Sequence, residues 1–259
     1  MIPFRSLRAP LCVLACAGAI AFGASMPAVA IDAKDRKEIE AIIKDYLVKN
    51  PEVLRDAIME LQKREAEAES RQRAVAVKEH QKLIFDSPRG VVVGNKSGDV
   101  TVVEFFDYNC GYCKRALDDM MTLMKSDSKL KFVLKEFPVL GQGSEEAARV
   151  AVAVRMQDKD GTKYLDFHRR LLGTRGEANG ARALAAAKDA GLDMTQIEKD
   201  MKSDEIRATI DESRTLADAL GISGTPSYVV AGEVVPGAVG AATLAKIVAS
   251  VRKCGAVTC

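Results

Sequence analysis

The chain has few residues that could bind a metal. It contains only two histidines, His80 and His168, and six cysteines in 259 residues. Cys110 and Cys113 have the spacing of half a zinc knuckle, but no second pair of ligands follows them closely in the sequence. The histidines have no partner that the sequence identifies, so we expect them on helix surfaces or in helix packing. No metal site is predicted.

Long apolar runs and a surplus of one charge are also absent. Arg5 and Arg8 precede an apolar stretch at 11–22, which is too short for a membrane span. Small residues at Ala28–Ala30 supply a cleavage site, so residues 1–30 are predicted to be a secretory signal peptide. The chain has 38 basic and 36 acidic residues. The leader holds two of the basic ones, so the remainder is formally neutral and has no electrostatic footprint for nucleic acid.

Loss of the leader removes Cys12 and Cys16. Four cysteines remain, in a compartment where disulfides form and persist, and we expect this compartment to be the periplasm. Lipidation of Cys16 is an alternative, which the short apolar region before it disfavours. Roughly 230 residues are left, which suits one large domain with an appendage.

The most informative stretch is Cys110-Gly111-Tyr112-Cys113. An apolar strand candidate at 100–106 precedes it, and a helix-forming run at 114–117 follows it. A cysteine at a helix N-terminus faces unpaired backbone N–H groups and the positive end of the helix dipole, which stabilise a thiolate. A second thiol one turn into the helix lies within disulfide reach. This order predicts redox chemistry.

Residues 31–86 are predicted to form a helical arm. They contain hardly any turn residue except Asn50-Pro51, where one helix ends and proline can open the next. The second helix is almost wholly charged over 63–73, so it cannot bury much of itself against a core. It is either a stalk that packs against copies of itself or a solvated helix, and we favour the stalk.

Residues 87–259 are predicted to form one α/β domain. Ser87-Pro88-Arg89-Gly90 breaks the helix before it. Helices fill the region from about 144 to 220 and separate a βαβ unit from a ββα unit. The predicted strands are 91–93, 100–106, 130–137, 227–230 and 233–235.

Three motifs in this order resemble the DsbA-like family of exported thiol-disulfide oxidoreductases. They are Glu104–Lys114, Leu134–Gly141 and Gly221–Pro226. That family has a thioredoxin-like fold with an inserted helical domain, and the resemblance covers about residues 88–253. In the arm, Tyr46–Pro51 resembles the N-terminal extension of ScsC-like members, which form trimers and shuffle disulfides. The resemblance implies exported cysteine-containing substrates, a membrane redox partner, a homotrimer, and no cofactor besides the cysteine pair.

The resemblance also assigns roles, each with a physical basis. Cys110, the thiol nearer the helix terminus, is expected to be an exposed, partly ionised nucleophile. Cys113 is expected to resolve the mixed disulfide between Cys110 and substrate. Glu104 resembles the buried acid that exchanges a proton with the inner cysteine. Strand alternation leaves an outward-facing Glu104 as the alternative.

Thr225-Pro226 resembles the family's cis-proline loop, whose backbone pairs with an extended substrate. Without the resemblance a trans bond would be expected, because few X–Pro bonds are cis. Gly111 and Tyr112 complete the expected substrate contacts. They stand where strongly oxidising relatives carry proline and histidine, and Tyr112 donates one neutral hydrogen bond at best. A weaker oxidant is therefore expected.

The C-terminal pair, Cys254 and Cys259, is predicted to be a structural disulfide that pins the end of the last helix. A redox-active pair and free thiols are the alternatives. The predicted function is an exported thiol-disulfide oxidoreductase, acting as an oligomeric disulfide isomerase or reductase. A monomeric dithiol oxidase and a periplasmic chaperone or copper(I)-binding protein are the alternatives.

Overall fold

The computed structural model describes residues 32–259. The predicted signal peptide, with Cys12 and Cys16, lies outside the described residues. The chain divides into two compact units, and the division falls between Glu60 and Leu61. None of the helices in the described part is long and apolar enough to cross a membrane.

The first unit contains α1 (Ala33–Lys49) and the start of α2 (Pro51–Glu79). The Asp32 side chain caps α1 by accepting hydrogen bonds from two backbone N–H groups of the first turn. Pro51 begins α2 as predicted, because a first helical position needs no N–H donor. No residue of α1 is buried. The exposed large apolar side chains of this unit are Ile39, Ile42, Ile43, Tyr46, Val48, Val53, Leu54, Ile58 and Met59.

The second unit is built on a five-stranded sheet with the order β1-β3-β2-β4-β5. β2 and β3 are parallel, and the other neighbouring pairs are antiparallel. The central position of β2 explains its apolar sequence, since neighbouring strands and helices cover it on every side. The five predicted strands are all present. They are β1 (Val91–Gly94), β2 (Val100–Phe106), β3 (Leu130–Glu136), β4 (Ser227–Val230) and β5 (Glu233–Pro236).

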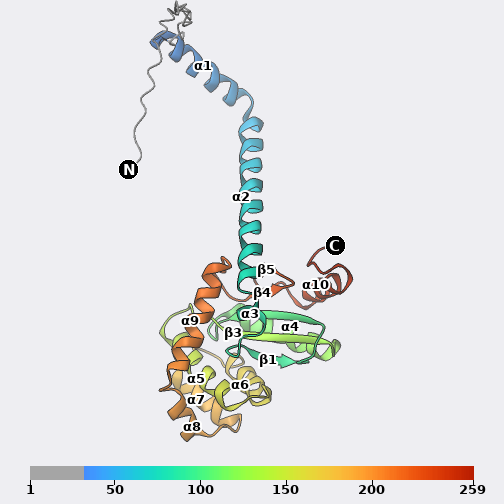
Figure 1. The fold of residues 1–259 in the computed structure, drawn as a ribbon. Helices are drawn as coiled ribbons and strands as arrows, with labels where there is room; N and C mark the ends of the chain where they lie inside the picture. The colour runs from blue at the N-terminus through green and yellow to red at the C-terminus, as the bar shows by residue number, and fades with distance from the viewer. Residues whose placement is uncertain (1–31) are drawn as a thin grey trace, which may run out of the picture. The chain divides into compact units, whose positions relative to one another are not determined.

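Helices cover both faces of the sheet (Figure 1). Val102 and Phe106 of β2 join one apolar cluster with α4 and α10, whereas Val103 and Phe105 join a second cluster with α9. Side chains of a strand alternate between its two faces, so Glu104 lies on the α4 and α10 side. The helices are α3 (Gln81–Phe85), α4 (Gly111–Ser126), α5 (Gln142–Gln157), α6 (Thr162–Leu172), α7 (Gly180–Asp189), α8 (Met194–Asp200), α9 (Asp204–Ala219) and α10 (Ala241–Cys254). The thioredoxin-like fold with inserted helices is confirmed.

The last turns of α2 belong to the second unit. Val77 of α2 is 4% exposed and Ile84 of α3 is fully buried, both in the cluster that includes α9. The buried Lys135 ammonium donates to the Leu83 carbonyl oxygen at 2.7 Å and to the Glu212 carboxylate at 2.9 Å. The end of α2 and α3 therefore pack on the same unit as the chain after the Ser87–Gly90 break.

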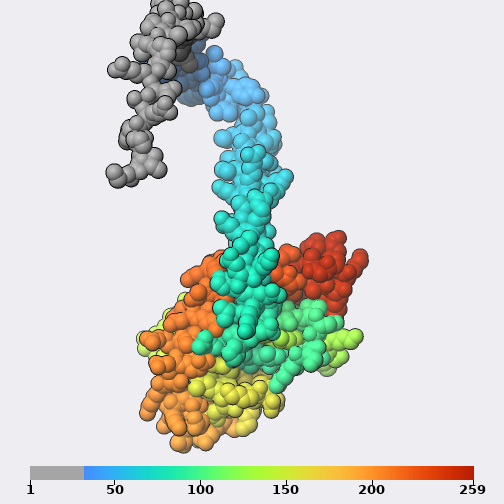
Figure 2. Space-filling model, in the orientation of Figure 1, coloured from blue at the N-terminus to red at the C-terminus, as the bar shows by residue number. Residues whose placement is uncertain are grey.

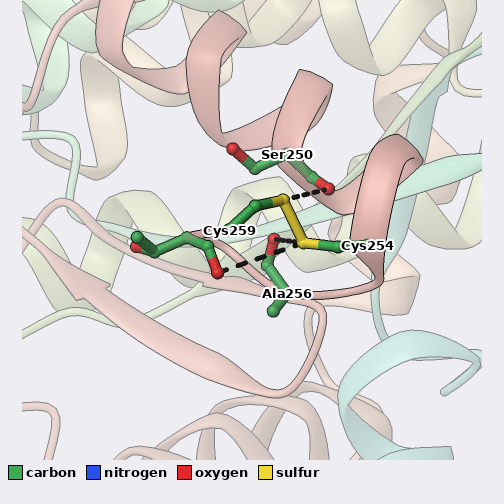
Figure 3. Close-up of a disulfide and its surroundings, with 5 residues drawn as sticks. Ser250, Cys254, Ala256 and Cys259 are labelled. Carbon is green, nitrogen blue, oxygen red and sulfur yellow. Dashed lines mark hydrogen bonds between the residues drawn. A yellow bond between two sulfur atoms is a disulfide. The ribbon is translucent and has the colours of Figure 1, made fainter.

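The C-terminus is closed by a disulfide between Cys254 and Cys259 (Figure 3). α10 ends at Cys254, and Gly255 follows in the left-handed conformation with φ of 77°. Glycine adopts this conformation without steric cost, so the chain can turn back toward the helix. The Cys259 sulfur then lies 3.3 Å from the Ser250 carbonyl oxygen.

Candidate active site

The two central cysteines lie at the start of α4. Cys110 is the N-cap residue, and its carbonyl oxygen accepts the first helical hydrogen bond, from Lys114 N–H at 3.1 Å. Cys113 lies one turn further along and is 1% exposed. Both cysteines are free thiols. A Cβ added at Gly111 would meet no atom within 4 Å, so this position leaves the front of the pair open.

The loop that carries Cys110 is held by the buried side chain of Asp107. One carboxylate oxygen accepts hydrogen bonds from Asn109 N–H and from the Ser144 hydroxyl, both at 2.7 Å. The other oxygen accepts from the backbone N–H groups of Val139 and Leu140 at 2.8 and 3.0 Å. Asp107 thus ties the β2–α4 loop to the β3–α5 connection and fixes the position of Cys110.

The predicted exposure of Cys110 is wrong, because the residue is only 6% exposed. The loop at Thr225-Pro226 lies against it, and the Thr225 carbonyl oxygen is 3.1 Å from the Cys110 sulfur. The peptide bond between Thr225 and Pro226 is cis. A hydrogen bond from Gly237 N–H to the Pro226 carbonyl oxygen, at 2.9 Å, holds this loop beside β5.

The Cys110 sulfur favours the thiolate form. A hydrogen bond from the Cys113 thiol is the largest cause that lowers the pKa of Cys110, to about 5, against the opposing effect of burial. The Thr225 side chain and the backbone N–H groups of Cys113 and Tyr112 add to this.

Cys113 has the opposite preference. Burial raises the pKa of the Cys113 thiol, and its hydrogen bond to the Cys110 sulfur raises it further. The pKa values of the two thiols therefore differ in opposite directions, so Cys110 favours the thiolate and Cys113 the protonated thiol. Such a difference is the pattern expected for a nucleophile and its resolving partner.

Glu104 is buried, with 4% of its surface exposed. Burial raises the pKa of Glu104 to about 8, and the nearby charges of Asp119 and Cys110 raise it too. The outward-facing alternative does not hold, because helices cover both faces of β2. Glu104 also raises the pKa of Cys113, so the two side chains are coupled.

Tyr228 is a site residue that the sequence reading missed. It is paired with Glu104 across β2 and β4. Its hydroxyl is buried and has no hydrogen-bond partner among residues 32–259. Burial is the main cause that raises the pKa of Tyr228, followed by the charges of Glu104 and Cys113. The sequence feature that could have indicated Tyr228 was its position two residues after Pro226, in a predicted strand. That strand, β4, pairs with β2.

Tyr112, between the two cysteines, has an exposed side chain. Its ring lies 4.3 Å from the Arg115 guanidinium in a cation–π contact. The residue affects Cys110 through its backbone N–H. Its ring is free to contact a substrate.

A buried polar cluster, also missed, lies behind the active-site loop. Glu136 accepts hydrogen bonds from the hydroxyls of Tyr164 at 2.5 Å and Tyr108 at 3.4 Å. The Tyr108 hydroxyl also lies 3.2 Å from Nδ1 of His168. Burial raises the pKa of Glu136 to about 8 and lowers that of His168 to about 3. The cluster joins the β2–α4 loop to β3 and α6, and His168 is a helix-packing residue.

Comparison with known proteins identifies the family. A model of the DSBA-like thioredoxin domain matches residues 101–249, more than half of the chain. The chain belongs to this family. A model of the copper resistance protein ScsC N-terminal domain matches residues 35–68, in the arm.

Solved structures and curated relatives agree with this assignment. The chain is 45% identical to a thioredoxin-like oxidoreductase from Silicibacter pomeroyi DSS-3, over 66% of this chain and 97% of that one, with a TM-score of 0.63. Proteus mirabilis ScsC is 28% identical, over 85% and 97% of the two chains, with a TM-score of 0.61. A probable disulfide bond formation protein D from Bacillus cereus is 25% identical over 54% of this chain and 69% of its own length. The chain spans only 22% of the first curated relatives, which are Na(+)/H(+) antiporters NhaA.

The pKa difference between the thiols predicts selective alkylation. In the reduced protein, iodoacetamide should label Cys110 with a rate that rises through a midpoint near pH 5, because the thiolate is the reacting form. Cys113 should stay unlabelled at neutral pH, because it is buried and protonated. Mass spectrometry of the labelled peptides measures both. Equal labelling, or faster labelling of Cys113, would contradict the assignment.

The raised pKa of Glu104 predicts that the unfolding free energy depends on pH. Its pKa is about 8 in the folded protein and 4.5 ordinarily, so the folded state keeps a proton that the unfolded state loses. Between these values its contribution to the unfolding free energy falls as pH rises, by up to about 1.4 kcal/mol per pH unit. Glu104→Gln should stabilise the reduced protein more at pH 8 than at pH 5.

Urea unfolding of the reduced protein at both pH values measures this effect. The exposed Glu233→Gln on β5 is the matched control and should follow the wild type. If Glu104→Gln keeps the wild-type pH dependence, Glu104 does not hold a proton in the folded state.

Proposed function

We propose that the protein is an exported thiol-disulfide oxidoreductase that acts through Cys110 and Cys113. The observation that carries this proposal is the placement of two free thiols at the start of α4, with Cys110 as N-cap beside Thr225 and Cys113 buried one turn further. Their pKa directions, toward thiolate for Cys110 and toward thiol for Cys113, support it. A thiolate attacks disulfides, and a neighbouring thiol that stays protonated until needed can then release the substrate. The predicted signal peptide supports a periplasmic location, where disulfides persist.

The proposed exchange has two steps. The Cys110 thiolate attacks a substrate disulfide, a Cys110–substrate disulfide forms, and one substrate sulfur leaves as a thiolate. Cys113 then loses its proton and attacks the Cys110 sulfur, so that the Cys110–Cys113 disulfide forms and the second substrate thiol leaves. The substrate gains two electrons and the protein loses two. The reverse sequence oxidises a substrate dithiol.

Glu104 is the proposed proton acceptor for Cys113. Its carboxylate is buried on the same side of the sheet and is electrostatically coupled to that thiol. A pKa of about 8 leaves a minor carboxylate fraction at neutral pH, so the group can both take and return a proton. Thr225 and Pro226 border the Cys110 sulfur and are proposed to align the substrate backbone. Gly111 and Tyr112 form the open side of the site.

Cysteine variants test the exchange with scrambled ribonuclease as substrate. Cys110→Ala should lose the activity, because the remaining thiol, Cys113, is buried and favours the protonated form. Cys113→Ala should still attack substrate but should accumulate mixed disulfides, since nothing resolves them. Gel electrophoresis without reductant detects these adducts. Adducts formed by Cys110→Ala through Cys113 would reverse the assigned roles.

A copper-binding role is the second candidate, because the family model matched by the arm is named for copper resistance. Copper(I) prefers soft thiolate ligands, and the cysteine pair supplies two. Metal capture needs only the thiols, whereas disulfide exchange also uses Glu104 as a proton carrier. Glu104→Gln should therefore slow ribonuclease refolding at least about tenfold. Copper(I) affinity should stay unchanged in this variant, and a refolding rate that also stays unchanged would favour the copper role.

The isomerase proposal depends on the arm. Its apolar side chains are exposed, with Ile42 62% and Leu54 53% accessible, and α1 buries none. Exposed apolar surface of this kind is typical of association surfaces. A homotrimer would gather several catalytic sites around one misfolded substrate and so raise their effective concentration. A membrane redox partner that resets Cys110 and Cys113 belongs to the same proposal.

Removing residues 31–62 should separate assembly from chemistry. We expect a folded, redox-active monomer with much lower isomerase activity, because the second compact unit begins at Leu61. Light scattering measures the mass of both proteins, and scrambled-ribonuclease refolding measures isomerase activity. A monomeric full-length protein at micromolar concentration would end the stalk hypothesis. Full isomerase activity in the truncated protein would show that the arm is not needed for isomerisation.

A further inference from the structure

A pocket of about 260 Å³ lies beside the Thr225-Pro226 loop. Residues 221–227 and the end of β5 form its walls, and Arg73 of α2 closes one side. Thr225 lines the pocket and its carbonyl oxygen lies 3.1 Å from the Cys110 sulfur, so one residue separates the pocket from the reacting atom. Its volume is below the range of typical small-molecule sites. It therefore suits a side chain of a bound polypeptide better than a separate ligand.

The position of Arg73 follows from the packing of α2. Val77 is buried in the second unit, and Arg73 lies one turn before it on the same helix face. The Arg73 Nε atom lies 3.3 Å from where a Cβ at Gly221 would be, so glycine lets the guanidinium approach the loop closely. Figure 2 shows the last turns of α2, in teal, on the surface of this unit.

Arg73 is the one charged residue among those that line this pocket. Its Nη2 atom donates to the Glu69 carboxylate at 3.1 Å, which leaves other N–H groups of the guanidinium available. The neighbouring walls are apolar or uncharged, as at Val234 and Pro236. A guanidinium with free donors in such surroundings recognises carboxylates, often through two parallel hydrogen bonds.

We propose that Arg73 binds an acidic side chain of the substrate polypeptide, close in sequence to the attacked cysteine. The inference rests on the proposed function, and it names a class of preferred substrate. It also gives α2 a role in substrate selection that is separate from association of the arm. Glu69 competes for the same guanidinium, so it limits the strength of this preference.

Two disulfide-containing peptides test the proposal on the full-length protein. They differ only in carrying Asp or Asn within a few positions of the cysteine. The wild type should react with the Asp peptide about two- to fivefold faster in kcat/KM, the range of an exposed ion pair. Arg73→Ala should lose this preference and keep its rate with the Asn peptide. Glu69→Gln should increase the preference.

Arg71→Ala is the matched control, because Arg71 pairs with Glu67 on the same helix and is 72% exposed. It should keep the wild-type preference. The proposal is overturned if the wild type shows no preference, if Arg73→Ala retains it, or if Arg71→Ala loses it equally. A wild type that reacts with neither peptide while Cys110 alkylates normally would instead overturn the proposed function.

Discussion

The active site depends on one interaction, the hydrogen bond from the Cys113 thiol to the Cys110 sulfur. It stabilises the Cys110 thiolate only while Cys113 keeps its proton, and the burial of Cys113 in the first turn of α4 favours the protonated thiol. The helix N-terminus adds backbone donors, but these alone would act on any N-cap cysteine. Because Cys113 is buried, the two thiols ionise differently. Cys110 is therefore the thiol that attacks first, and Cys113 is the thiol that attacks second.

The rest of the domain holds this pair in place with buried polar groups. Asp107 fixes the loop before Cys110, and Glu136 with its tyrosine partners supports that loop from behind. Glu104 and Tyr228 pair across β2 and β4, and burial raises the pKa of both side chains. Such groups cost stability, and proteins keep them where chemistry requires a proton to move.

The local part of the fold could be predicted from the sequence. Periodicity and turn residues located all five strands, and the cysteine motif after β2 placed Cys110 at a helix start. The burial of Cys110 could not be predicted, because the covering residue, Thr225, is distant in the sequence. The burial of Val77 could not be predicted for a similar reason, since the residue follows a charged stretch of α2 and has no local sign of its packing.

The missed residues share this property. Tyr228 belongs to the site because it pairs with Glu104 across two strands. Arg73 belongs to the proposed binding pocket because it approaches Gly221. Each reads locally as an ordinary strand or helix residue. Only the tertiary arrangement places Tyr228 beside Glu104 and Arg73 beside the 221–227 loop, whereas the resemblance had already pointed to Pro226 and Glu104.

Buried, protonated Cys113 sets the ionisation of Cys110. This dependence can be measured by ultraviolet absorbance of the thiolate, followed against pH in the reduced wild type and in Cys113→Ala. The midpoint should lie near pH 5 in the wild type and clearly higher in the variant, because the largest stabilising hydrogen bond is lost. An unchanged midpoint in Cys113→Ala would contradict it.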